Sequence, residues 1–367
     1  MNNYIIFTLI AFLCSFICGY ITIPMVLNLC KHYGLYDIPN TRKIHNNAIP
    51  RLGGIVFLPC VFIGCIIVFA ITQLQGEQTI TFSLWTVYFT IGLVAIYITG
   101  IIDDIIGLDA FKKLAVQLVA SCVMPASGLY INNLYGFCGI YEIPFSAGFL
   151  LTIIVMAFIS NAINLIDGID GQASGLTIIA LCGFIYAFGK WGLWFYVIMI
   201  ASLVGVLLAY TYFNLFGKVE HNRKIFMGDT GSLSIGFLLA FLSLKLTMKN
   251  PNLSIYDGNG LLLSYTVLIV PVFDAIRVAL VRIRHHRSPV SPDKNHIHHK
   301  LMRAGLSQHK TLCVVLCFAI FYIALNWLLN MFTNITAIVA INIAVYVIFH
   351  KVIDRIIIRH GQQTEVF

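Results

Sequence analysis

Four clusters of polar residues interrupt this apolar chain, and each could bind a metal ion or a phosphate. They are the pair Asp103-Asp104, the segment NLIDGIDG at 164–171, the segment FMGD at 226–229 and the segment DKNHIHH at 293–299. Each cluster lies at the end of an apolar run. A carboxylate at the edge of a membrane span is costly to desolvate, so such a residue usually has a function. Carboxylates beside a basic, histidine-rich loop indicate a divalent cation and a phosphorylated substrate at a membrane surface.

The pair Asp103-Asp104 ends an apolar segment with the sequence GIIDDIIGL. Adjacent carboxylates repel each other unless a cation lies near them. The pair could therefore hold a metal ion or supply a general base for a weakly acidic nucleophile. The alternative is a pair of solvated charges, although the C-terminus of a helix disfavours anions.

The segment NLIDGIDG combines two carboxylates with two glycines. Asp167 and Asp170 have the spacing of neighbours on one helix face, and Asn164 lies three residues before Asp167. Gly168 and Gly171 leave room for a ligand to approach the backbone. We expect this segment to bind a ligand; the alternative is that the aspartates only cap the next helix. The spacing does not match an EF-hand calcium loop.

The segment FMGDTGS places Asp229 between glycines, just before a helix expected to begin near residue 232. A helix N-terminus attracts phosphate. A carboxylate at that position would instead hold Mg²⁺, which in turn binds phosphate oxygens. Capping of the helix by Asp229 is the alternative, and the two roles can coexist.

The last basic loop carries three histidines, His296, His298 and His299. Zinc sites usually add cysteine or carboxylate ligands at longer spacing. We therefore expect these imidazoles to bind diphosphate oxygens together with their basic neighbours, which are Lys294, Lys300 and Arg303. Metal ligation and a solvated loop are the alternatives.

Another basic loop lies near the N-terminus and reads YDIPNTRKIHNNAIPRLGGI. Its cations could face a lipid phosphate or a nucleotide; they are Arg42, Lys43, His45 and Arg51. A purely solvated loop is the alternative interpretation.

The elements that position these clusters are apolar segments long enough to cross a membrane. The chain has 367 residues, of which 59% are hydrophobic and 10% charged, whereas a soluble domain carries about 25% charge. A span needs roughly 20 apolar residues, and eleven segments are candidates: 4–29, 53–74, 80–102, 113–130, 145–164, 172–189, 191–213, 232–248, 259–281, 310–331 and 335–350. We predict one all-α, polytopic integral-membrane domain over residues 1–367, with the first span retained. We also expect a small hairpin at 131–144 and a short helix at about 295–304, ended by Gly305.

Basic residues orient the predicted spans. All but three of the 23 Lys and Arg residues follow odd-numbered spans or lie in the C-terminal tail; the exceptions are Lys190, Lys245 and Lys249. Positive residues stay on the cytoplasmic side, so we expect the N-terminus outside and the C-terminus inside. All four polar clusters then face the cytoplasm. This bias explains most of the net charge of +8, so no nucleic-acid partner is expected.

The motifs DD, NLIDGIDG, FMGDTGS and NHIHH, in this order over about residues 20–310, resemble the polyprenyl-phosphate N-acetylhexosamine-1-phosphate transferases of glycosyltransferase family 4. The segment PNTRKIH and the interrupted histidine motif are similar to the WecA/TagO-like branch, which uses UDP-N-acetylglucosamine. The peptidoglycan branch, which transfers phospho-N-acetylmuramoyl-pentapeptide, usually has three uninterrupted histidines. Here Ile297 separates them, which counts against that substrate.

The resemblance implies an enzyme of the bacterial plasma membrane. It would transfer N-acetylhexosamine 1-phosphate from a UDP-sugar to undecaprenyl phosphate, releasing UMP, with Mg²⁺ or Mn²⁺ as cofactor. The product would begin the synthesis of a cell-surface polysaccharide such as lipopolysaccharide or a cell-wall polymer. The implied oligomeric state is open and allows a homodimer.

The resemblance also implies roles for individual residues. Asp103 and Asp104 match the pair that activates the lipid phosphate, and Asp229 matches a magnesium ligand, with Asp167 as a second. The matching nucleotide-sugar contacts are Asn164, Asp167, Asp170, Asn214, His296, His298 and His299. Arg42, Lys43, His45 and Arg303 are candidates for the lipid phosphate or the diphosphate.

Two other classes fit the sequence less well. A secondary transporter would carry ionisable residues near the membrane midplane in broken helices, whereas here they lie at the ends of the spans. A CDP-alcohol phosphotransferase would need the motif D-G-x-x-A-R, but Asp170-Gly171 is followed by Gln-Ala-Ser.

Overall fold

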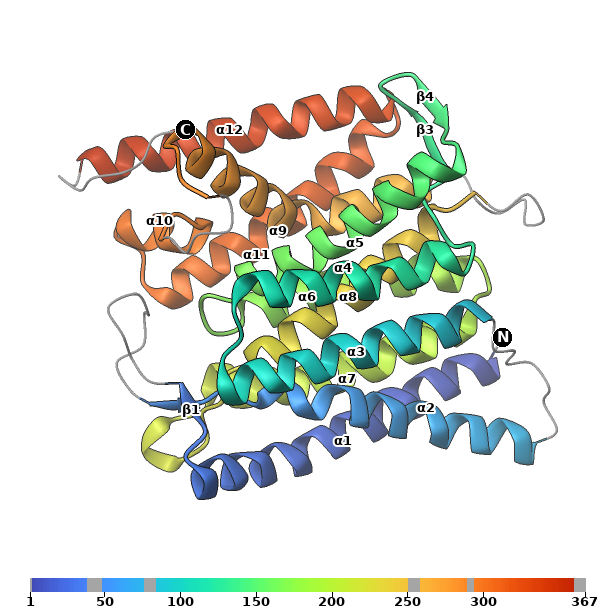
Figure 1. Ribbon diagram of the computed structural model, residues 1–367, viewed down its shortest axis with the longest axis vertical. Helices are drawn as coiled ribbons and strands as arrows, with labels where there is room; N and C mark the ends of the chain where they lie inside the picture. Colours follow the sequence, from blue (N-terminus) through green and yellow to red (C-terminus); the bar gives the residue numbers. More distant parts are fainter. Residues whose placement is uncertain (1, 38–47, 76–83, 250–257, 289–293, 360–367) are drawn as a thin grey trace.

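The chain folds into a bundle of long helices that run roughly side by side (Figure 1). The computed structural model describes residues 2–37, 48–75, 84–249, 258–288 and 294–359. The long helices are α1 (Asn2–Tyr33), α2 (Phe57–Leu74), α3 (Leu84–Ile106), α4 (Ala110–Ala126), α5 (Phe145–Ile166), α6 (Gln172–Lys190), α7 (Trp194–Phe216), α8 (Gly228–Thr247), α9 (Gly258–Arg284), α11 (Gln308–Leu329) and α12 (Ile335–Arg359). Each of the eleven predicted spans corresponds to one of them.

Nine helices within the described ranges are long and apolar enough to cross a membrane. The predicted spans outside this group are α4, which has only 17 residues, and α9. The multi-pass, all-helical architecture is therefore confirmed, whereas the number of eleven spans stays a prediction.

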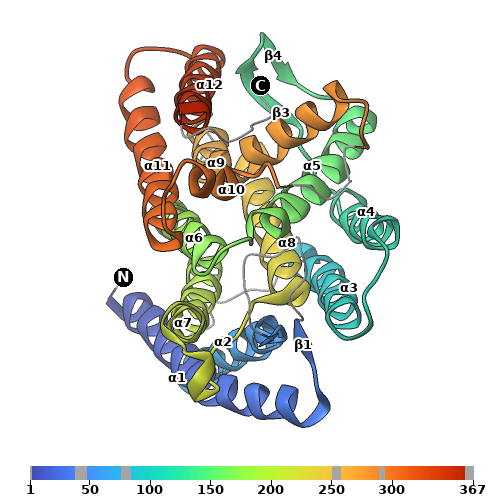
Figure 2. The ribbon, with the colours of Figure 1, turned by 90° about the vertical axis from the view of Figure 1, so that its left-hand side faces the viewer.

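Helix α8 forms the centre of the bundle (Figure 2). All its residues from Thr230 to Thr247 are buried, as expected for a helix that is apolar on every side. Glycines let its neighbours approach closely, which is a common device in membrane helices. A Cβ added at Gly236 would lie 2.6 Å from Cα of Ser160 on α5, and one at Gly100 on α3 would lie 2.4 Å from Cα of Thr230. This packing brings the C-terminal ends of α3 and α5 to the N-terminal end of α8.

The predicted minor elements are confirmed. An antiparallel hairpin contains β3 (Asn133–Phe137) and β4 (Ile140–Glu142). The last loop contains the short helix α10 (Ile297–Arg303), which Gly305 follows with a φ of +94°. A second antiparallel pair, β1 (Tyr36–Asp37) with β2 (Ile49–Pro50), was not predicted, because strands of two residues show no alternating pattern.

Two predicted helix boundaries were wrong. Helix α3 continues to Ile106, beyond the aspartate pair, and α8 begins at Gly228 rather than near residue 232. The short 3₁₀ helix Gly53–Val56, just before α2, packs against the start of α8: the Gly54 backbone N–H donates to the Met227 carbonyl at 2.8 Å. Because α8 begins at Gly228, Asp229 belongs to its first turn.

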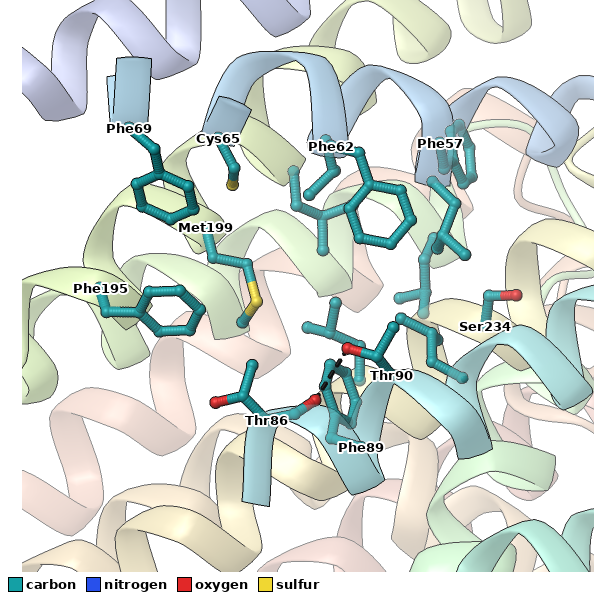
Figure 3. Close-up of a pocket in the computed structure, with 16 residues that line it drawn as sticks. Phe57, Phe62, Cys65, Phe69, Thr86, Phe89, Thr90, Phe195, Met199 and Ser234 are labelled. Atoms are coloured by element: carbon teal, nitrogen blue, oxygen red, sulfur yellow. Dashed lines mark hydrogen bonds between the residues drawn. The ribbon is translucent and has the colours of Figure 1, made fainter. Parts of the chain in front are cut away.

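One cavity inside the bundle lies between α2, α3, α7 and α8 and has a volume of about 120 Å³ (Figure 3). Aromatic side chains from these helices surround it, including Phe62, Phe89 and Phe195. None of the described residues that line it carries a charge. This cavity has no groups for phosphate chemistry, so the reactive residues must be sought at the end of the bundle.

Candidate active site

The predicted site residues meet in a pocket where α3 and α5 end and α8 begins. Its volume is about 370 Å³. The predicted residues that line it are Asp103, Asp104, Asn164, Asp167, Asp170, Asn214, Asp229 and His299. Segments that are far apart in the sequence thus place five of the predicted carboxylates around one space.

Asp104 holds the first turn of α8. Its Oδ1 accepts a hydrogen bond from the backbone N–H of Asp229 at 2.9 Å. Its Oδ2 accepts two more, from the backbone N–H and the hydroxyl of Thr230, at 2.9 and 2.6 Å. The first N–H groups of a helix have no partner within the helix, and the helix dipole favours a carboxylate beside them. This bonding explains why α8 begins early, and it gives the two adjacent aspartates different environments.

Asp103 shares a cation with Asp229. Lys113 Nζ lies 3.1 Å from Asp103 Oδ2 and 2.7 Å from Asp229 Oδ2. Asn164 supports the same arrangement, because its Nδ2 donates to Asp229 Oδ1 at 2.9 Å and to Ser232 Oγ at 2.8 Å. Sequence analysis missed the role of Lys113 because a lysine after a span also fits the positive-inside pattern.

The carboxylates are spaced suitably for a divalent cation. Among the described residues, Asp103, Asp104 and Asp229 each offer one oxygen within 4.8 Å of the others. Mg²⁺ prefers oxygen ligands and is usually held by one or two carboxylates together with substrate phosphates. Asp104 already accepts three hydrogen bonds, so Asp229 is the better candidate for a ligand within this group. The residues present therefore fit a magnesium ion.

Asp167, the other predicted metal ligand, lies outside that group, directly after α5. It is half-buried and lines the pocket. Desolvation raises its pKa to about 7, and repulsion from Asp229, Asp170 and Asp104 acts in the same direction. A nearby cation would favour its charged form. Its assignment as a metal ligand stays a prediction.

Asp170 and Asn214 form a second network on the pocket wall. Lys224 Nζ lies 2.6 Å from Asp170 Oδ2, and Gln308 Nε2 donates to the same oxygen at 3.0 Å. Asn214 Oδ1 accepts from the Gly171 backbone N–H at 2.7 Å, and its Nδ2 donates to the Ile225 carbonyl at 2.9 Å. Asn214 therefore fixes the NLIDGIDG loop to the segment before α8. Sequence analysis missed Lys224 and Gln308, since neither residue stands in a motif.

The three histidines occupy different environments. His296 is buried, with its Nδ1 2.8 Å from Asp274 Oδ2 on α9. His298 is also buried and packs on the NLIDGIDG loop, where a Cβ added at Gly168 would lie 2.1 Å from its Nε2. His299 lines the pocket. The prediction that all three contact a ligand therefore has direct geometric support only for His299.

Burial lowers the pKa of the two histidines that face the NLIDGIDG loop and the pocket. The pKa of His299 is lowered to about 4, first by burial and then by electrostatic interactions with His296, Arg303 and Lys294. Burial also lowers the pKa of His298 well below its usual range. A neutral imidazole can donate only one hydrogen bond, so in this form each ring has a single N–H to offer.

The remaining predicted contacts are basic residues of the first and last basic loops. Arg42, Lys43 and His45 are outside the described residues. Arg303 donates to Asn295 Oδ1 at 2.9 Å and is not among the residues that line the pocket. Arg51 does line it and lies 3.9 Å from Asp37, so the first basic loop reaches the site through this residue.

Comparisons with known proteins show which sequences this chain is similar to. Residues 85–247 match glycosyl transferase family 4. A probable undecaprenyl-phosphate N-acetylglucosaminyl 1-phosphate transferase from Bacillus subtilis is 32% identical over 314 residues, which cover 83% of this chain and 80% of the relative. The undecaprenyl-phosphate alpha-N-acetylglucosaminyl 1-phosphate transferase of Yersinia pestis is 31% identical over 77% of this chain and 73% of the relative. The decaprenyl-phosphate N-acetylglucosaminephosphotransferase of Mycolicibacterium smegmatis is 31% identical over 78% of this chain and 73% of the relative.

Proposed function

Because the chain belongs to glycosyl transferase family 4, we propose that it transfers N-acetylglucosamine 1-phosphate from UDP-N-acetylglucosamine to undecaprenyl phosphate. The products would be UMP and an undecaprenyl-diphosphate sugar that begins a cell-surface polysaccharide. The observation that carries the proposal is the convergence of Asp103 and Asp229 on Lys113, in a pocket at the end of membrane-spanning helices. The names of the relatives above support the choice of sugar and lipid.

Charge neutralisation is the first task of such a site, because both substrates are anionic. Lys113 pairs with Asp103 and Asp229, and Lys224 pairs with Asp170, so both ammonium groups contact carboxylates that line the pocket. Mg²⁺, when held by Asp229 with Asp167 nearby, would further neutralise the diphosphate.

The reaction exchanges one phosphoanhydride for another. An oxygen of the lipid phosphate forms a bond to the β-phosphorus of the UDP-sugar, and the bond from that phosphorus to the bridging oxygen breaks, so that UMP leaves. The driving force is small, and positioning with electrostatics supplies most of the catalysis. Asp103 is the residue proposed to deprotonate the lipid phosphate, because Asp104 already holds the start of α8.

The donor would bind on the opposite wall. Asp170, Lys224 and Gln308 form the network there, and His299 lines the pocket. The NLIDGIDG segment contributes Asp167 and Asp170 to the pocket that Asp103, Asp104 and Asp229 also line. In this proposal the uridine side of the donor would lie on the loop, with its diphosphate toward the carboxylates.

Adding a methyl group at Gly168 should disturb this wall. The new Cβ would lie 2.1 Å from His298 Nε2, and the buried imidazole cannot move without shifting α10. Misplacement by about 1 Å can cost 10²-fold in rate, so we expect Gly168→Ala to lower kcat/KM for UDP-N-acetylglucosamine by roughly tenfold or more. Gly189→Ala is the matched control, since its Cβ would meet only Val197 Cγ2 at 4.0 Å. Equal kcat/KM values for the two variants would contradict this placement of His298.

A panel of UDP-N-acetylhexosamines, assayed with undecaprenyl phosphate and Mg²⁺ for release of UMP, tests the proposed sugar. We expect UDP-N-acetylglucosamine to be the preferred donor. Preference for UDP-N-acetylmuramoyl-pentapeptide would instead indicate the peptidoglycan reaction, and turnover of a 4-epimeric or 6-deoxy sugar alone would correct the sugar.

We propose that the pocket faces the cytoplasm of the bacterial cell, as the distribution of basic residues predicts. The β3–β4 hairpin, which carries the exposed Cys138, would then lie outside. A membrane-impermeant thiol reagent should label Cys138 in intact cells, and a Cys138→Ala variant should lose that label. Labelling of a cysteine placed at Lys294 under the same conditions would show that the orientation is inverted.

A further inference from the structure

Asp274, on α9, is a buried carboxylate that lies outside the pocket but contacts the histidine loop. Its side chain is fully buried. Its Oδ2 lies 2.8 Å from His296 Nδ1. Its Oδ1 accepts a hydrogen bond from the backbone N–H of Ile297, the first residue of α10, at 3.0 Å. One carboxylate therefore contacts two consecutive residues at the start of α10.

Arg277 completes this contact from the next turn of α9. Its Nη2 donates to Asp274 Oδ1 at 2.8 Å and also to the backbone carbonyl of Asn295. The guanidinium is as buried as the carboxylate, with side-chain exposures of 2% and 0%. A buried carboxylate is tolerated only when it is paired and hydrogen-bonded, so Arg277 allows Asp274 to remain charged against the loop.

Helix α10 needs such an anchor because it has only seven residues. An isolated helix of this length is unstable in water. Lys300, in the same helix, pairs with Asp354 of α12 at 2.5 Å. The hydrogen bonds from the Asp274–Arg277 pair of α9 and the Lys300–Asp354 ion pair therefore hold α10 against the bundle.

The anchored end of α10 leads directly to the pocket. His298 packs on the NLIDGIDG loop at Gly168, and His299 lines the pocket itself. Residues 296 and 297, which Asp274 binds, immediately precede these two histidines. A shift of the Asp274 contact would therefore move His299 relative to the carboxylates.

We propose that Asp274 is a positioning residue, which fixes the start of α10 so that His299 faces the donor side of the pocket. The proposal rests on the proposed function in one respect, since it assigns the donor UDP-sugar as the ligand whose affinity depends on the anchor. Asp274 itself touches no substrate in this account. Its loss should raise KM for the donor more than it lowers kcat.

Two double variants isolate this role. Asp274→Asn/Arg277→Met and Asp274→Leu/Arg277→Met both remove the buried charges as a pair, so neither leaves an unpaired charge inside the protein. Both also lose the bond from Arg277 to Asn295. They differ in one respect: asparagine can keep the bond from the Ile297 N–H with its one amide oxygen and can donate from its amide nitrogen to an unprotonated His296 Nδ1, whereas leucine can do neither.

We expect KM for UDP-N-acetylglucosamine to rise at least tenfold in the leucine variant. In the asparagine variant, KM should stay within about threefold of the wild-type value. Hydrogen–deuterium exchange should be faster at residues 295–304 in the leucine variant alone. Equal KM values and equal exchange in the two variants would overturn the proposal.

The controls separate this proposal from simple destabilisation and from the proposed function. Asn342→Ala removes a buried polar group, bonded to Asn326 at 2.8 Å, without touching α10; it should lower Tm while leaving KM unchanged. A rise in KM for this variant matching that of the leucine variant would also overturn the proposal. Failure of the proposed function would appear as no turnover by the wild-type protein, whereas the exchange measurement tests the anchor without turnover.

Discussion

Asp229→Asn is expected to reduce kcat for sugar-phosphate transfer by about 10²–10³-fold or more, the loss typical when one preorganised electrostatic group is removed. Asp229 contacts Lys113 and Asn164 through different oxygens and belongs to the group of carboxylates suited to a divalent cation. Asparagine keeps the shape of the side chain but removes the charge. The measurement is UMP release at saturating donor and lipid, as a function of Mg²⁺ concentration.

The control for this variant is Asp109→Asn. Asp109 is an exposed carboxylate at the N-terminus of α4, the helix that carries Lys113. It should retain near wild-type turnover. Both variants should show the same elution profile in detergent, which establishes that they are folded. Full activity of Asp229→Asn, or full activity of the wild-type protein in excess EDTA, would contradict the proposed magnesium site.

The adjacent aspartates Asp103 and Asp104 are expected to fail in different ways. Asp103→Asn should lower kcat by about 10²–10⁴-fold, the usual contribution of a general base, with little change in KM for the UDP-sugar. Asp104→Asn should lower activity and also Tm, because asparagine offers only one acceptor oxygen to the N–H groups that Asp104 now binds. Loss of a helix cap typically costs about 0.5–2 kcal/mol.

Steady-state kinetics and thermal unfolding of the two variants check this division. A loss of less than tenfold for Asp103→Asn would argue against its role as the base. A greater kinetic loss for Asp104→Asn, with an unchanged Tm, would indicate that Asp104 is the acting group. If both variants raised KM for the UDP-sugar with kcat intact, the pair would be a binding element and the mechanism would have to be withdrawn.

The sequence predicted the long helices well because their apolar runs dominate the composition. It also predicted the β3–β4 hairpin and helix α10 from glycines and local polarity. The boundary of α8 was wrong because Asp104, on another helix, caps its first turn. A contact between residues so distant in the chain leaves no local pattern at Gly228.

The candidate pocket was predicted as a set of residues but not as a geometry. Motif spacing identified Asp103, Asp229 and the NLIDGIDG carboxylates, which the structure brings together. It did not distinguish His299, which lines the pocket, from His296, which contacts Asp274. The direction in which each side chain points depends on what the short helix packs against. The sequence did not distinguish Lys113 from the other basic residues that follow membrane spans.

The central claim is tested most directly by the purified protein, UDP-N-acetylglucosamine and Mg²⁺, with and without undecaprenyl phosphate. The account predicts that UMP is released only when the lipid is present and that the amount of undecaprenyl-diphosphate sugar formed equals the UMP released. Release of UMP at the same rate without the lipid would contradict the transfer reaction, as would the absence of any lipid-linked product when both substrates and the metal are supplied.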